Sequence, residues 1–152
     1  MAEAKALRER VEYSVDDQSE TVVAGFRPNG QWSLYFGSDP VYHFTADGAL
    51  RRAFCGDDLY RTQGTTLARL RRVRTGDEVQ LVRHDLTPDE LANFCARMNE
   101  LLANLKRAID SGSAQIVRQF PDDKDVEARL LAALPGAMKS HLAARVKRGA
   151  GN

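Results

Sequence analysis

The sequence contains none of the short motifs that usually identify an enzyme. It has no Gly-x-Ser-x-Gly nucleophile motif, no glycine-rich phosphate loop, no Cys-x-x-Cys pair and no dinucleotide-binding fingerprint. The pair His84-Asp85 occurs in metal-dependent phosphohydrolases, but such a site needs further distant ligands, and the chain has only three histidines. Catalysis therefore has no positive support in the sequence, and we expect neither a cofactor nor a bound metal.

Cysteines and long apolar runs are also scarce. Cys55 follows a predicted strand and Cys95 lies on the apolar stripe of a predicted helix, so we expect two small buried side chains and no disulfide framework. No uncharged apolar run approaches the roughly 20 residues that a bilayer-spanning helix needs. Met1 leads into a charged segment, unlike a signal peptide. We therefore expect a cytoplasmic protein without membrane association.

The composition is that of one globular domain. The 152 residues, 43% hydrophobic and 28% charged, are enough to bury one core and too few for two full domains. No internal repeat or low-complexity tract is present. We predict a single domain over residues 1–152, β-rich over 20–86 and helical over 87–148, with a basic tail at 145–152.

Charge is unevenly distributed along the chain, although the net charge is only +1. Between Ala49 and His84, eight arginines and no lysine stand against four acids, a local balance of +4. The segment 139–152 has four cations and no acid, whereas 3–20 and 122–127 are rich in acids. The sequence therefore predicts separate basic and acidic patches on one protein.

The beginning of the chain is predicted to change from helix to strand. Residues 2–13 have helix formers at most positions and are predicted to form a short helix with a thin apolar stripe. A polar connector follows over 16–20. Residues 21–26 and 31–36 then alternate apolar and other side chains on either side of the turn 28–30, which predicts a hairpin.

Further short strands separated by turn residues are predicted up to residue 84, over 41–45, 49–54, 59–62, 65–74 and 78–84. In the second of these, Leu50, Arg52 and Phe54 are expected on one face. The segment 66–74 fits a helix as well as a strand, because its apolar residues recur three apart. We favour a strand, because the turn 75–77 allows it to pair with the alternating segment that follows.

A long amphipathic helix is predicted over 87–111. Thr87 and Glu90 form a capping box around Pro88, apolar residues recur every three or four positions, and Gly112 follows the end. Residues 113–120 are a candidate for one more strand.

Two further helices complete the prediction, one broken near Pro135 and a last one containing Met138, Leu142 and Val146. The predicted fold is α+β: an antiparallel meander of about six strands, curled into a half-barrel, with the long helix packed on the Trp32 face.

Arginine is the residue type that carries the functional hypothesis. Its planar guanidinium suits bidentate contact with phosphate, and a nearby Tyr60 or Tyr35 would add the stacking surface that single-stranded nucleic acid needs. We therefore predict a non-catalytic module that binds a polyanion, with nucleic acid as the expected ligand, through an arginine-rich sheet face. The candidate binding residues are Arg51, Arg52, Arg61, Arg69, Arg71, Arg72, Arg74 and Tyr60, with Lys139, Arg145 and Arg148 of the basic C-terminal segment.

Other interpretations remain open at this point. The arginines fit equally a solvated sheet face paired with nearby acids, or a site for a small anionic metabolite, and C-terminal cations complement a helix dipole without any ligand. A protein-interaction or assembly module, including a homo-oligomer, would use the oppositely charged patches. An enzyme acting on an anionic substrate around Asp39, His43 and Arg51 is the third alternative, although a structural role for His43 is favoured.

Overall fold

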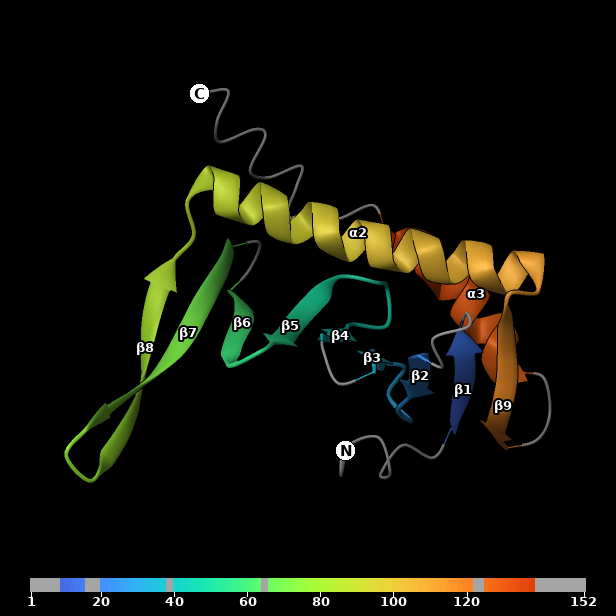
Figure 1. The fold of residues 1–152 in the computed structure, drawn as a ribbon, viewed down its shortest axis with the longest axis horizontal. Helices are drawn as coiled ribbons and strands as arrows, with labels where there is room; N and C mark the ends of the chain where they lie inside the picture. Colours follow the sequence, from blue (N-terminus) through green and yellow to red (C-terminus); the bar gives the residue numbers. More distant parts are fainter. Residues whose placement is uncertain (1–8, 16–19, 38–39, 64–65, 122–124, 139–152) are drawn as a thin grey trace.

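The computed structural model describes residues 9–15, 20–37, 40–63, 66–121 and 125–138. These residues form one open antiparallel sheet of nine strands and two helices (Figure 1). The strands are β1 Glu9–Val15, β2 Glu20–Phe26, β3 Trp32–Phe36, β4 Val41–Phe44, β5 Leu50–Cys55, β6 Asp58–Gln63, β7 Thr66–Thr75, β8 Glu78–Asp85 and β9 Ala114–Phe120. The helices are α2 Pro88–Ser111 and α3 Asp125–Met138.

The sheet is a meander of eight consecutive strands, extended by one returning strand. Its order is β8-β7-β6-β5-β4-β3-β2-β1-β9, and every neighbouring pair is antiparallel. Helix α2 runs along the sheet from the β8 end toward the β9 end, where α3 lies beside it (Figure 1). The predicted α+β class is therefore confirmed, but the sheet has nine strands rather than about six and does not close.

The hairpin of β2 and β3 forms where the alternation predicts it. Val22 lies opposite Phe36 and Phe26 opposite Trp32, with the turn closed by the Arg27 N–H donating to the Gln31 carbonyl at 2.8 Å. Trp32 also stacks on Phe44 of β4, with 4.4 Å between ring centroids. Large aromatic side chains thus fill the centre of the sheet face that α2 covers.

Helix α2 begins and ends as the sequence predicts. The Glu90 N–H donates to the Thr87 hydroxyl and the Thr87 N–H donates to the Glu90 carboxylate, at 3.1 and 2.9 Å, which is the predicted capping box. Gly112 ends the helix in the left-handed conformation. The buried residues of α2 are Cys95, Met98, Leu102 and Leu105, and they join the same core as Trp32.

The predicted N-terminal helix is wrong for the part that the structure describes. Residues 9–13 belong to β1, which pairs with β2 on one side and β9 on the other. Val11 and Tyr13 alternate into the core and are fully buried. The burial and ladder hydrogen bonds available between two strands outweigh the small intrinsic helix preference of this segment. The rest of the predicted helix, residues 2–8, lies outside the described residues.

Helix α3 is fixed to the β1 end of the sheet by side-chain contacts. The Tyr13 hydroxyl donates to the Glu127 carboxylate at 2.8 Å, and the Arg129 guanidinium lies 4.4 Å from the centre of the Phe26 ring. The predicted break at Pro135 is wrong, because α3 continues through it to Met138. The predicted last helix falls on residues 139–152, outside the described residues.

A β-bulge corrects the predicted facing of β5. Opposite β4, His43 pairs with Arg52 but Phe44 pairs with Leu50, so one extra residue, Arg51, is accommodated. Leu50 consequently faces the core with Phe44, whereas Phe54 lies on the opposite face of the sheet with His43. Sequence alternation alone had placed Leu50 and Phe54 together.

Candidate nucleic-acid interface

The register of strands β5 to β8 sorts their arginines onto two faces. Tyr60 of β6 packs against Phe94 of α2 and lies opposite Arg69, so it marks the face toward α2. Residues at alternate positions of the same ladders lie on the other face. Five arginines occupy that other face, which we call the arginine face: Arg52, Arg61, Arg72, Arg74 and Arg83.

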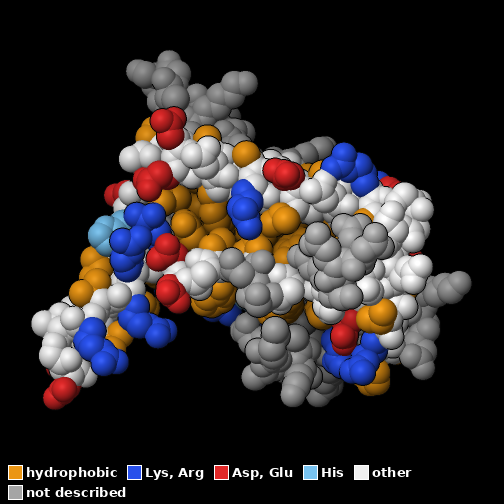
Figure 2. Space-filling view, in the orientation of Figure 1, with side chains coloured by type: hydrophobic (Ala, Val, Ile, Leu, Met, Phe, Trp, Pro, Cys, Tyr) orange, Lys and Arg blue, Asp and Glu red, His pale blue; other side chains and the backbone are white. Residues whose placement is uncertain are grey.

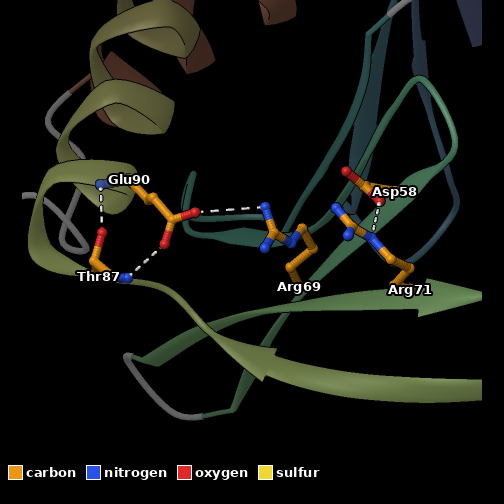
Figure 3. A network of polar contacts seen from close by, with 5 residues as sticks. All are labelled: Asp58, Arg69, Arg71, Thr87 and Glu90. Atoms are coloured by element: carbon orange, nitrogen blue, oxygen red, sulfur yellow. Dashed lines mark hydrogen bonds and ion pairs between the residues drawn. The ribbon is translucent and has the colours of Figure 1, made fainter.

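Two of the predicted binding residues, Arg69 and Arg71, lie instead on the face toward α2. The Arg69 guanidinium is 3.5 Å from the Glu90 carboxylate, which itself belongs to the capping box, and Arg71 is 3.6 Å from Asp58 (Figure 3). Hydrogen bonds with Thr87 and the nearby Arg69 lower the pKa of Glu90. Both arginines therefore already have anionic partners within the protein.

Strands β7 and β8 extend beyond the rest of the sheet as a two-stranded arm (Figure 1). We define the arm as residues 71–82, and every residue over 71–80 is exposed. Thr75 pairs with Glu78 across the turn, where Gly76 adopts a φ of +62°. The predicted strand over 66–74 and its pairing through this turn are confirmed.

On the arginine face, the arm carries one arginine and one aliphatic side chain in each cross-strand pair. The arm contains two such pairs, Arg72 with Leu81 and Arg74 with Val79, and the pair Leu70 with Arg83 continues the pattern just before the arm. Leu81 is 57% exposed and Val79 is 48% exposed. Figure 2 shows basic side chains interspersed with hydrophobic ones along the arm, with an acidic side chain at its end.

The arginine face is less neutralised than the face toward α2. Among the described residues, Arg61, Arg72 and Arg74 have no ion pair within 4.0 Å, whereas Arg83 contacts Asp85 at 3.3 Å. The acids of the arm, Asp77 and Glu78, lie at its turn. A negative polymer lying across the arginine face would therefore meet guanidinium groups that need not first release a carboxylate.

The tyrosines predicted to supply stacking do not lie on the exposed part of this face. Tyr60 is half-buried on the face toward α2, with 4.7 Å between its ring and that of Phe94, and burial raises the pKa of its hydroxyl. Tyr35 lies on the arginine side but is only 5% exposed. Among the described residues of β5 to β8, the exposed aromatic ring on this face is that of Phe54, with the Arg52 guanidinium 5.8 Å from its centre.

The remaining predicted binding residues are not assembled with the arginine face in the described structure. Arg51 lies at the β5 bulge and is half-buried. Lys139, Arg145 and Arg148 lie outside the described residues.

His43 is a buried residue of the sheet. Its Nδ1 atom lies 2.7 Å from the Ser33 hydroxyl, and its ring meets Tyr35 and Phe54 edge to face. Because His43 is fully buried, a substrate could not contact its ring without rearrangement of the sheet. Asp39, the acid considered with it, lies outside the described residues. The part of the chain that the structure describes contains no group of three side chains able to hold a metal ion.

A separate cavity of about 770 Å³ opens between α2 and the ends of β1, β2 and β3. Its floor is apolar, with Phe36 and Leu105 among the lining residues, and Arg107 and Asp110 stand at its polar side. None of the predicted binding residues lines it.

Sequence reasoning missed part of the arginine face. Arg83 was counted in the basic segment but not selected, and Val79 and Leu81 were taken only as the apolar side of a strand. Counting outward from the turn at Gly76 would have placed Arg83 opposite Leu70 and Leu81 opposite Arg72. Their exposure depends on what covers the sheet, which the local sequence does not encode.

Comparison with family models, with curated proteins and with solved structures found no significant match to this chain. Neither helix in the described part of the chain is long and apolar enough to cross a membrane.

Proposed function

We propose that the protein is a nucleic-acid-binding module that contacts phosphate groups through the arginine face. The observation that carries this proposal is the gathering of Arg52, Arg61, Arg72, Arg74 and Arg83, from four consecutive strands, on the same side of the sheet. Three of them have no ion pair among the described residues. Guanidinium groups spaced along adjacent strands provide a positive surface that follows a phosphate backbone.

Binding of this kind is largely independent of base sequence and strongly dependent on salt. Each neutralised phosphate releases condensed counterions, so the affinity falls with a slope of about −0.9 per contact in a plot of log K against log salt for duplex DNA. Removing one contacting arginine should lower the magnitude of this slope by about one and weaken binding to all sequences similarly.

The test compares arginines on the two faces of the same strand. Affinities for labelled oligonucleotides are measured between low and physiological salt for the wild type, the double variant Arg72→Gln/Arg74→Gln and the control Arg71→Gln. We expect the salt slope of the double variant to be smaller in magnitude by roughly two. The slope of the control should equal that of the wild type. Absence of binding at low salt, or an equal decrease of the salt slope in both variants, would refute the proposal.

A second candidate function, self-assembly, is favoured by the other edge of the sheet. β9 pairs only with β1 among the described strands, and it exposes Ile116, Val117 and Phe120. An edge strand with unpaired backbone groups and exposed apolar side chains can pair with the same strand of a second copy.

The assembly proposal is tested by measuring molecular mass in solution over a range of concentrations. Val117, which is 60% exposed, is replaced by lysine to make edge pairing unfavourable. We expect the wild type to be dimeric and Val117→Lys to be monomeric. A wild type that stays monomeric at high concentration would exclude this function.

A further inference from the structure

We infer that the preferred ligand is double-stranded DNA and that the arm binds along its major groove by the arginine face. This inference rests on the proposed function and deepens it. The sequence pointed to single-stranded nucleic acid, because arginines and tyrosines were expected on one face. In the structure, Tyr35 on the arginine side is buried and Tyr60 lies on the other face, so neither tyrosine accompanies the exposed arginines of the arm.

The dimensions of the arm suit this groove. Residues 71–75 and 78–82 form two paired strands, each about 16 Å long at roughly 3.3 Å per residue. Neighbouring strands lie about 4.8 Å apart, so a two-stranded ribbon fits a major groove about 12 Å wide. The corresponding groove of an RNA duplex is deep and too narrow for side chains to read. B-form DNA is therefore favoured over duplex RNA.

The side chains on the arginine face of the arm suit the chemistry of the groove. Arg72 and Arg74 can contact the phosphates that border the groove, while Leu81 and Val79 beside them can contact the thymine methyl groups that a mixed sequence presents there. This arrangement gives a role to two aliphatic side chains that are otherwise exposed to water without a partner layer. Because Asp77 and Glu78 lie at the turn, the arm is expected to lie flat in the groove rather than enter it by its tip.

A single-stranded ligand is disfavoured because it requires exposed rings on which bases stack. Among the described residues, the arginine face of β5 to β8 exposes the ring of Phe54, whereas Tyr35 is buried and Tyr60 packs on α2. The exposed ring of Phe120 is on the same side of the sheet but lies on β9, at the opposite edge from the arm. Phe54 lies on β5, away from the arm, and the arm itself has no aromatic residue.

The first experiment compares three probes of equal length and sequence: a DNA duplex, one of its single strands, and the corresponding RNA duplex. Titration of the full-length protein by fluorescence anisotropy at a fixed, moderate salt concentration gives the three affinities. We expect the DNA duplex to bind at least roughly tenfold more tightly than either other probe, because it alone offers the wide major groove.

The second experiment tests the position of the arm. The double variant Val79→Ser/Leu81→Ser removes the aliphatic groups of the arginine face, and Val73→Ser is its matched control on the other face of the arm. We expect the double variant to lose roughly fivefold or more in duplex affinity with an unchanged salt slope, because no charge is removed. Val73→Ser should bind like the wild type. Circular dichroism confirms that all variants are folded.

A chemical footprint places the contact directly. Dimethyl sulfate methylates guanine N7 in the major groove and adenine N3 in the minor groove, so protection of guanine N7 alone is the expected result. If no probe binds at low salt, the proposed function fails. If binding occurs but the single strand or the RNA duplex binds as tightly, or adenine N3 is the protected atom, only the major-groove inference fails.

Discussion

The same alternation of apolar and polar residues occurs at both ends of the sheet, but the helices leave the arm at one of these ends uncovered. At the β1–β4 end, α2 and α3 cover one face, and side chains such as Leu34 and Phe44 are fully buried. At the β7–β8 end, eleven consecutive residues over 71–81 are exposed, although Val73, Val79 and Leu81 are apolar. Alternation therefore specifies a strand at both ends, but only a second layer converts the apolar side of that strand into a core.

The arm depends on its attachment to the packed end. Its ladder continues without interruption from Ala68 opposite Asp85 to Thr75 opposite Glu78. An isolated two-stranded hairpin is at best marginally stable in water. The pairing of the arm is therefore stabilised by its continuation into the packed sheet. We expect the arm to open locally far more often than the packed end. The predictions below test this contrast, from the largest expected effect to the smallest.

Removal of a central ring should have the largest effect. Phe44→Ala deletes a fully buried ring that stacks on Trp32, and we expect it to lower the free energy of unfolding by about 3–5 kcal/mol. Leu81→Ala in the arm should change it by less than about 0.5 kcal/mol. Urea unfolding monitored by Trp32 fluorescence measures both. Similar losses of unfolding free energy in the two variants would mean that the arm is packed as tightly as the β1–β4 end.

Two glycines with positive φ provide a matched pair. Gly48 has a φ of +96°, and an added Cβ would lie 3.0 Å from backbone atoms of Gly136 and Ala137, whereas at Gly76 nothing lies within 4 Å. Gly48→Ala should cost about 2 kcal/mol or more, because backbone strain and a contact with α3 combine. Gly76→Ala should cost about 1 kcal/mol. Thermal unfolding of both variants distinguishes the two sites, and an equal loss would show that the close approach is unimportant.

The start of α2 lies at the β8 end of the sheet, and its capping box should make an intermediate contribution to stability. Thr87→Ala removes the hydroxyl that accepts from the Glu90 N–H, and we expect a loss of about 1 kcal/mol. Thr87→Ser keeps this acceptor and serves as the control in the same denaturation experiment. A Thr87→Ala variant as stable as the control would argue against the capping box.

Replacement of Glu90 should have a smaller effect on the free energy of unfolding, and this effect should depend on pH. Its pKa is lowered in the folded protein by hydrogen bonds with Thr87 and by Arg69. A lowered folded-state pKa stabilises the fold above the unfolded-state value, about 4.3, and this contribution is lost as the pH falls through the lowered folded-state pKa. Glu90→Gln should therefore be less stable than the wild type near neutral pH and converge with it in acid. Denaturation at a series of pH values tests this, and a constant difference would contradict it.

Shortening the arm should have the smallest effect on stability. Deletion of 72–75 and 78–81 joins Arg71 to Val82 through the existing Gly76-Asp77 turn, and it removes an even number of residues from each strand, so the facing is kept. We expect the free energy of unfolding to change by no more than about 0.5 kcal/mol. A loss above about 2 kcal/mol would mean that the arm belongs to the core after all.

Local sequence signals predicted several elements well. The hairpin around Gly30, the strand pairing through Gly76 and the limits of α2 at Thr87 and Gly112 were all expected and are present. Each depends on residues within a few positions of one another. The candidate site was predicted only as a group of arginines. To see that Arg69 and Arg71 face α2 while Arg72 and Arg74 lie on the opposite face, one needs the strand register and the position of α2.

The amino-acid sequence alone determined most of the turns, the caps of α2 and the period of most segments, because these follow from steric and hydrogen-bonding preferences of neighbouring residues. Only the tertiary structure made residues 9–13 a strand, since their partners β2 and β9 lie on either side and β9 comes about a hundred residues later. It also inserted the bulge at Arg51 and left the arm uncovered. These outcomes depend on burial against distant segments, which no local pattern contains.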